Sequence, residues 1–164
     1  MSDLNSMKKG WIFNEEWGFG GVAPEEKACE CWGRALLSCA NGDGELTPEE
    51  RNWVLGYSAI NGVSPEHIEM LRTYEANEDI TQILSEALRE GVSLNGTERA
   101  LVYDLIRVCA ADGDITAGER DTVYKMAELL GVGRETVDLL EVAYYSEVAA
   151  KKTRWKIAYP QPLF

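Results

Sequence analysis

The sequence predicts an all-α protein, a compact bundle of about seven helices built from two related halves in tandem. Apolar residues recur at spacings of three and four between residues 24 and 146, which is the period of one helix face. Apolar and polar residues seldom alternate there, so strands are not indicated. The chain also contains an internal repeat, which favours two packed copies of one helical unit.

Start and stop signals bound these helices in order along the chain. A proline or a capping residue marks four starts, at Pro24, Thr47, Ser64 and Thr116. Glycines mark the stops, at Gly44, Gly62, Gly91, Gly113 and Gly131. Apolar stripes define the helices between these signals, for example Ile80, Ile83, Leu84, Ala87 and Leu88. The predicted helices span residues 24–41, 47–61, 64–75, 78–90, 95–110, 116–130 and 134–147. Short connections imply that consecutive helices pack against one another within one domain, residues 23–147.

Two arms flank this domain and differ from it in character. Residues 1–22 place aromatic side chains among glycines, and residues 148–164 combine basic and aromatic residues with two prolines. Neither arm has a helical pattern, and we expect their rings to be buried across the bundle. The alternative is an exposed patch that docks a partner protein. The basic residues of this patch would also attract acidic lipid weakly. Its candidate residues are Arg154, Trp155, Lys156 and Tyr159.

Charge and hydropathy exclude several classes of function. Twenty-eight acidic residues against sixteen Lys and Arg give a net charge of −12, which repels a phosphate backbone, so no nucleic-acid partner is expected. No long apolar segment is present, so membrane insertion and secretion are not expected. We therefore expect a cytoplasmic protein, at most peripheral at the inner face of the membrane.

The cysteine and histidine content argues against a zinc centre. Cys29 and Cys31 are two residues apart on a predicted helix, so their side chains point in different directions and suit one ion poorly. All four cysteines are expected to be reduced. His67 is the only histidine and follows Ser64-Pro65, so we expect it to occupy the first turn of a helix without a catalytic role.

The internal repeat joins distant parts of the chain. Leu36–Leu71 aligns without a gap on Leu105–Leu140 at an offset of 69 residues, with eleven of thirty-six positions identical. Turns, caps and core positions recur together, so we expect halves at about residues 24–75 and 95–146 to pack about an approximate two-fold axis. Such an axis would place the two Asp-Gly turns in corresponding positions.

Both copies contain the element Asp-Gly-[Glu/Asp]-[Leu/Ile]-Thr-x-x-Glu-Arg, which has two interpretations. An EF-hand is disfavoured because Cys39 and Val108 stand where the first ligand of a calcium loop belongs. In the first interpretation the threonine and the glutamate form a capping box. In the second, converging turns form a carboxylate cluster suited to Mg²⁺, Mn²⁺ or Ca²⁺. The two interpretations are compatible, because a carboxylate can accept several hydrogen bonds. The candidate ligands are Asp43, Glu50, Asp112 and Glu119, with Glu45 and Asp114 as weaker candidates.

The second copy carries a family resemblance. Ala110-Ala111-Asp112-Gly113-Asp114-Ile115-Thr116-Ala117-Gly118-Glu119-Arg120 is followed by an amphipathic helix that ends in Leu129-Leu130-Gly131-Val132. With its repetition in the first copy, this segment resembles the TerB-like family of tellurite resistance proteins, over about Pro24 to Ser146. The first copy departs from the pattern, since Asn41-Gly42 replaces Ala110-Ala111, and the two half-sites need not be equivalent.

The resemblance implies a function class and no enzymatic activity. It implies a helical bundle of two related halves in a bacterial stress response, often beside a membrane-embedded partner, with metal binding through the acidic motif residues named above. We therefore expect a non-catalytic binding module. Two alternatives stay open, a metal-dependent hydrolase that uses the same carboxylates and a structural protein that forms a homodimer through its aromatic arms.

Overall fold

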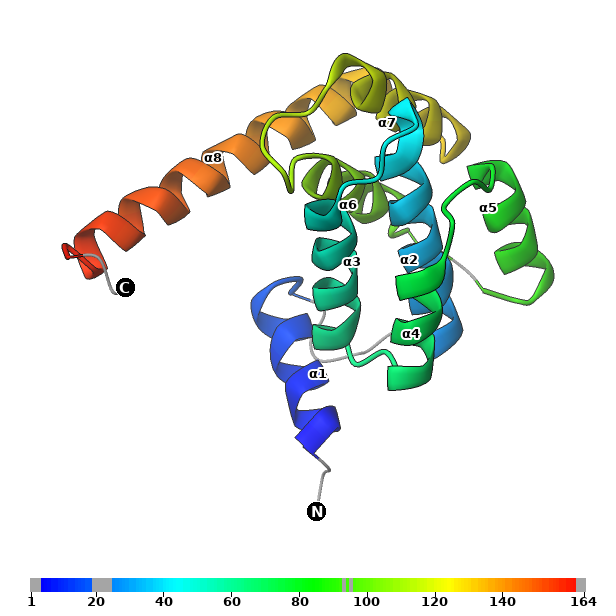
Figure 1. The fold of residues 1–164 in the computed structure, drawn as a ribbon, viewed down its shortest axis with the longest axis horizontal. Helices are drawn as coiled ribbons and strands as arrows, with labels where there is room; N and C mark the ends of the chain where they lie inside the picture. The colour runs from blue at the N-terminus through cyan, green and yellow to red at the C-terminus, as the bar shows by residue number, and fades with distance from the viewer. Residues whose placement is uncertain (1–3, 19–24, 93, 95, 162–164) are drawn as a thin grey trace.

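The computed structural model describes residues 4–18, 25–92, 94 and 96–161 of the chain (Figure 1). In these ranges there are eight α-helices, one short 3-10 turn and no strand, which confirms the all-α prediction. The elements are α1 (Leu4–Glu15), α2 (Glu26–Ala40), η1 (Asn41–Asp43), α3 (Pro48–Ile60), α4 (Pro65–Thr73), α5 (Ile80–Arg89), α6 (Glu98–Cys109), α7 (Ala117–Leu129) and α8 (Arg134–Ala158).

The predicted helices α2 to α7 agree with the structure to within three residues at each end. Ser64 and Thr116 accept hydrogen bonds as N-caps, while Pro24, the expected start of α2, lies outside the described residues. The organisation into two halves about a two-fold axis stays a prediction.

The prediction that the arms are not helical is wrong in two places. Residues 4–15 form α1, which lies against α3 and buries Ile12 and Phe13. At the other end α8 continues eleven residues beyond its predicted end at 147. No glycine follows Gly133, the next proline is Pro160, and alanine, lysine and arginine favour a helix, so nothing ends α8 earlier.

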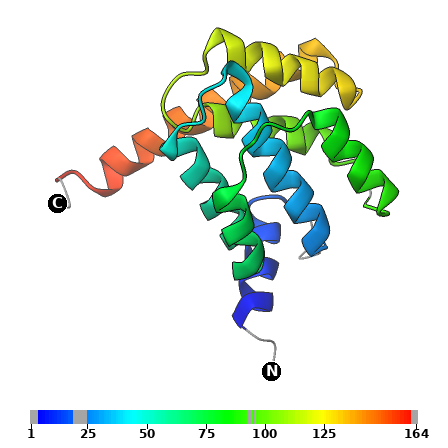
Figure 2. The same ribbon diagram turned by 45° about the vertical axis from the view of Figure 1, so that its right-hand side comes forward.

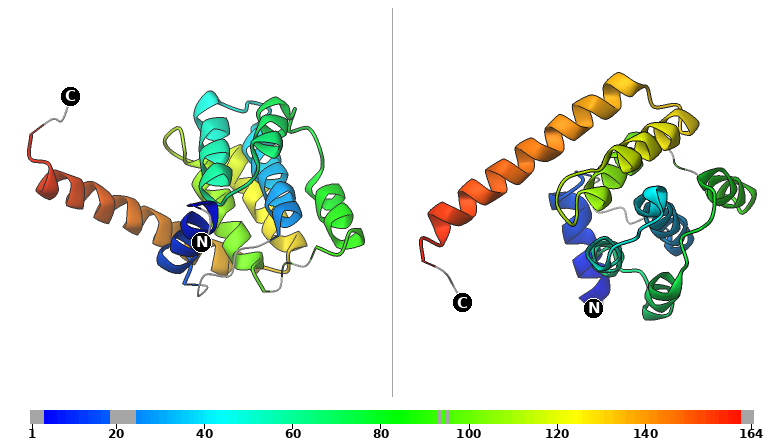
Figure 3. Two further views of the ribbon diagram at one scale, coloured as in Figure 1. Left: turned by 90° about the horizontal axis from the view of Figure 1, so that it is seen from below. Right: turned by 45° about the horizontal axis from the view of Figure 1, so that its top comes forward.

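The arms also differ in burial. Trp11 of α1 is 63% exposed, and Trp155 and Tyr159 at the other end are 52% and 55% exposed. The expectation that the C-terminal rings are buried is therefore wrong, because this part of α8 extends beyond the bundle (Figure 3). Phe19, also expected to be buried, lies outside the described residues.

The core lies around α2, which contacts α3, α4, α5, α6 and α7 (Figures 1 and 2). Leu36 and Leu37 of α2 are fully buried, and so is Leu105 of α6. They belong to one core cluster with buried apolar residues of the neighbouring helices. Burial of this apolar area is the main stabilising contribution. Within the described ranges, no helix is both long enough and apolar enough to cross a membrane.

The η1 turn is packed tightly against α7 at Gly42. A Cβ atom at this position would lie 2.3 Å from Thr122 Oγ1 and 2.8 Å from Thr122 Cβ. Gly42→Ala is therefore expected to lower the free energy of unfolding by about 1–3 kcal/mol through overpacking. Gly56→Ala is the matched control, since Gly56 lies within α3 with open space around it, and should stabilise by about 0.5–1 kcal/mol. Urea unfolding of both variants checks this, and equal effects would contradict the packing argument.

Candidate functional site

The two repeated turns lead into helices that begin in the same way. Thr47 Oγ1 accepts a hydrogen bond from the Glu50 backbone N–H at 3.2 Å, and the Thr47 backbone N–H donates to Glu50 Oε2 at 2.8 Å. The equivalent bonds between Thr116 and Glu119 are 3.2 and 2.7 Å long. Both capping boxes are therefore formed, which confirms the capping interpretation.

These two capping glutamates also contact each other in the interior. Glu50 is 0% exposed and Glu119 is 4% exposed, and the two carboxyl groups lie close enough to share a hydrogen bond when one of them is protonated. Burial, reinforced by the neighbouring Glu119, raises the pKa of Glu50 to about 7 from an ordinary value of 4.5. Glu50 Oε1 is buried and accepts no hydrogen bond from a protein donor in the described part of the chain. A shared proton or a cation would satisfy this pair.

The other candidate residues do not join the pair in one cluster. Asp43 Oδ2 accepts a bond from Thr116 Oγ1 at 3.4 Å, so the first turn touches the start of α7. Asp43 Oδ1 also accepts from the backbone N–H of Glu45 at 3.0 Å. Asp112, Glu45 and Asp114 are exposed on the turns. Within the described ranges, no three His, Cys, Asp or Glu side chains are gathered closely enough to hold a metal ion.

A second buried carboxylate was missed by the sequence analysis. Asp104 of α6 is 0% exposed, and its Oδ2 accepts bonds from Trp32 Nε1 at 3.0 Å and from the Tyr57 hydroxyl at 2.6 Å. Arg107 Nη1 lies 3.3 Å from Asp104 Oδ1. Burial raises the pKa of Asp104 to about 6, against the lowering effect of these three partners. The missed signal was an aspartate within the apolar stripe of α6 with an arginine three residues later.

The Arg107 guanidinium lies over several aromatic rings. Its distance to the ring centroids is 5.2 to 5.8 Å for Trp17, Trp53, Tyr57 and Tyr103. Cation–π attraction and the ion pair with Asp104 together hold this side chain. Asp104 is thus engaged by Trp32, Tyr57 and Arg107, whereas the buried Tyr103 hydroxyl has no hydrogen-bond partner in the described part of the chain.

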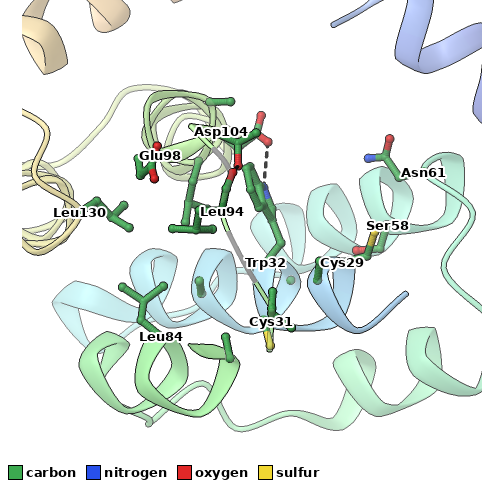
Figure 4. A pocket seen from close by; sticks show the side chains of 18 of the residues that line it. Cys29, Cys31, Trp32, Ser58, Asn61, Leu84, Leu94, Glu98, Asp104 and Leu130 are labelled. Carbon is green, nitrogen blue, oxygen red and sulfur yellow. Dashed lines mark hydrogen bonds between the residues drawn. The ribbon is translucent and has the colours of Figure 1, made fainter. Parts of the chain in front are cut away.

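A mostly apolar cavity of about 640 Å³ lies beside this cluster, between α2, α5 and α6 (Figure 4). Trp32 extends across it toward Asp104, and Leu84 and Leu94 contribute to its wall. Asn61 Oδ1, near one end, is buried without a hydrogen-bond partner in the described chain. The volume is in the range of small-molecule pockets. Two carboxylates line it, Asp104, which already accepts hydrogen bonds from Trp32 and Tyr57, and Glu98.

The cysteines and the histidine contact neighbouring protein groups and, in the described part of the chain, have no arrangement typical of a zinc or catalytic site. None of the four cysteines forms a disulfide, and Cys39 Sγ and Cys109 Sγ lie 3.9 Å apart in the core. The Cys39 contact and burial raise the pKa of Cys109, which disfavours the reactive thiolate. His67, in the first turn of α4, lies 2.8 Å from Glu26 and 3.2 Å from Glu30, and the bond to Glu26 raises its pKa.

Comparison with known proteins gives one family and one solved structure. The family profile described as tellurite resistance protein TerB matches residues 35–142. The crystal structure of a tellurite resistance protein from Nostoc punctiforme is similar over 99% of this chain and 98% of the other, at 35% sequence identity and a TM-score of 0.85. No curated protein matches. Since the structural match includes almost the whole chain, it extends over α1 and α8 as well as the core.

Proposed function

The chain belongs to the TerB family of tellurite resistance proteins, and from this we propose that it is a non-catalytic binding module that takes up a divalent cation between Glu50 and Glu119. The single observation that carries the proposal is the buried pair of carboxyl groups with the unpartnered oxygen Glu50 Oε1. Buried carboxylates in contact are costly unless a proton or a cation compensates their charge.

The chemistry of the donors fits a hard cation. Carboxylate oxygens are preferred ligands of Mg²⁺, Mn²⁺ and Ca²⁺. Glu50 uses Oε2 for its capping bonds, which leaves Oε1 as the ligand atom. Asp43, whose Oδ2 accepts a hydrogen bond from Thr116 at the start of α7, is the candidate proposed to supply a further oxygen. When bound, the cation supplies positive charge in place of a shared proton.

A bound cation would connect two helices of this chain. Glu50 belongs to the first turn of α3 and Glu119 to the first turn of α7, so an ion between them would hold the starts of two helices together. Each glutamate keeps its own capping bond, and the cation therefore adds a link without removing a cap. Such a link would make the stability of the bundle depend on cation concentration.

Calorimetric titration tests the proposal. Mg²⁺, Mn²⁺ and Ca²⁺ are titrated separately into the full chain near pH 7.5, and at least one is expected to give a saturating heat. Glu119→Gln should abolish this heat, because the amide keeps an acceptor for the Thr116 N–H but loses the charge.

The matched control is Glu49→Gln, an exposed glutamate beside Glu50 in the first turn of α3. It should bind the cation as the natural chain does. No heat from any ion, or an equal loss of heat in both variants, would overturn the proposed site.

A further inference from the structure

The helix α8 is longer than the bundle that supports it. It runs for 25 residues from Arg134 to Ala158, and it packs against α6 and α7 of the same chain. Val137, on the inner face, is buried, whereas every residue from Ala149 to the end of the helix is exposed. Figures 1 and 3 show this second part extending away from the other helices.

The outer face of α8 carries an uncharged seam whose large apolar residues lie toward its two ends. Leu139, Val142 and Ile157 are 64%, 63% and 75% exposed. Between them the spacing of three and four continues through small or uncharged residues, and the seam consists of Leu139, Val142, Ser146, Ala149, Thr153 and Ile157. This spacing is typical of a helix that pairs with another helix, and small central residues allow close approach.

Charge along α8 is divided into two halves of opposite sign. Residues 134–147 contain one arginine and four acidic residues, a net charge of 1 − 4 = −3, and residues 148–158 contain four basic and no acidic residues, a net charge of +4. Two copies paired in parallel would place like charges together. Glu141 is already paired with Arg120 of α7. In an antiparallel pair, the basic half of each helix lies over the half of the other that carries the exposed Glu135, Asp138 and Glu147.

We propose that two copies of this chain form a homodimer through the outer faces of α8, antiparallel about a two-fold axis near Val148. With this centre, Leu139 of each copy lies opposite Ile157 of the other, and the small residues meet at the axis. Asp138, whose Oδ1 also accepts a hydrogen bond from the Tyr124 hydroxyl of its own chain, lies on the same flank of the seam as Lys156 by helical spacing, so the pair brings it near Lys156 of the second copy. The bundles lie on opposite sides of the pair, since each α8 packs on its own bundle through its inner face.

The same features disfavour a lipid surface as the occupant. An anionic membrane would attract residues 148–158 and repel the acidic half of α8, although the seam includes both halves. A second copy in the antiparallel orientation would complement the charge of both halves of α8 and cover the whole seam. This surface is separate from the Glu50–Glu119 pair, so Glu119→Gln should dimerise as the natural chain does.

Light scattering coupled to size exclusion measures the mass of the full chain at micromolar concentrations. The expected mass is twice 18.3 kDa. Val142→Glu and Ile157→Glu should each give a folded monomer with the helical circular dichroism spectrum of the natural chain, because both side chains are exposed. Trp155→Ala is the control, since Trp155 is also exposed, at 52%, but lies on the opposite face of α8, and it should leave the dimer intact.

A charge exchange tests the orientation. Lys156→Glu should raise the dissociation constant of the dimer about tenfold, and Asp138→Lys in the same chain should restore it by reversing the pair. A monomeric natural chain, a dimer that survives both seam variants, or a double variant no tighter than Lys156→Glu would overturn the proposal. A monomer that binds vesicles of anionic lipid would assign the helix to a membrane surface instead.

Discussion

Replacing Glu50 by Gln is expected to stabilise the cation-free protein above pH 7. The pKa of Glu50 is about 7 in the folded chain against an ordinary value of 4.5, because the carboxyl group is buried beside Glu119. A pKa that is raised by folding contributes stability that is fully present below pH 4.5 and is lost as the pH rises through about 7. The full difference corresponds to at most about 3 kcal/mol. Glutamine stays neutral and still offers an oxygen to the Thr47 N–H.

Urea unfolding at pH 5 and pH 8 measures this effect. The natural chain should lose about 1–3 kcal/mol relative to Glu50→Gln between these two values, which corresponds to several degrees in melting temperature for a chain of this size. Excess Mn²⁺ at pH 8 should then stabilise the natural chain and not the variant. Glu49→Gln serves as the exposed control. A Glu50→Gln protein that is less stable than the natural chain at pH 8 would contradict the burial argument.

Removal of the Asp104 carboxylate is expected to produce the largest loss of stability among these variants. Asp104→Ala leaves the Trp32 N–H, the Tyr57 hydroxyl and the Arg107 guanidinium without their acceptor. Two half-buried donors then lose their partner, and the half-buried Arg107 keeps only the ion pair with Glu16 at 3.5 Å, which together costs about 2–4 kcal/mol. Trp32 connects α6 to α2 and Tyr57 connects α6 to α3, so the loss weakens the packing of α6 with both helices.

Denaturant unfolding with tryptophan fluorescence measures the loss directly, since Trp32 is one of the affected donors. Asp121→Ala removes an exposed aspartate from α7 and should change stability by no more than about 0.5 kcal/mol. An Asp104→Ala protein within 1 kcal/mol of the natural chain would show that these hydrogen bonds contribute little.

Local signals were sufficient where a helix is bounded by its own residues. Thr47 and Thr116 are followed three residues later by glutamates, and both capping boxes form. The ends were harder to predict, because α1 depends on the burial of Ile12 and Phe13 against another helix. The end of α8 depends on the absence of a stop signal, which the change in composition at residue 148 obscured.

The sequence predicted which residues form the candidate site but not that Glu50 and Glu119 are buried. The repeat suggested that the two turns converge, and capping alone would leave Glu50 and Glu119 at the surface. Their burial depends on how α3 and α7 approach each other across the chain, which residue spacing does not specify. The Asp104 cluster likewise depends on how separate helices approach each other, since its donors Trp32 and Tyr57 come from α2 and α3.

Other expectations are not tested by the structure and stay predictions. They include the membrane-embedded partner, the cytoplasmic location and the alternative of a metal-dependent hydrolase. The exposure of Trp155 and Tyr159 leaves the inner face of the C-terminal arm accessible to a partner, on the side of α8 opposite the proposed dimer seam.

The most direct test of the central claim is the anomalous scattering of a crystal of the full chain soaked in Mn²⁺. We expect a peak between the carboxyl groups of Glu50 and Glu119, within ligand distance of Glu50 Oε1. The same soak of Glu119→Gln should show no peak there. An ordered pair of glutamates in direct hydrogen-bond contact, with no scattering between them in the natural chain, would contradict the cation site and leave a shared proton as the compensating charge.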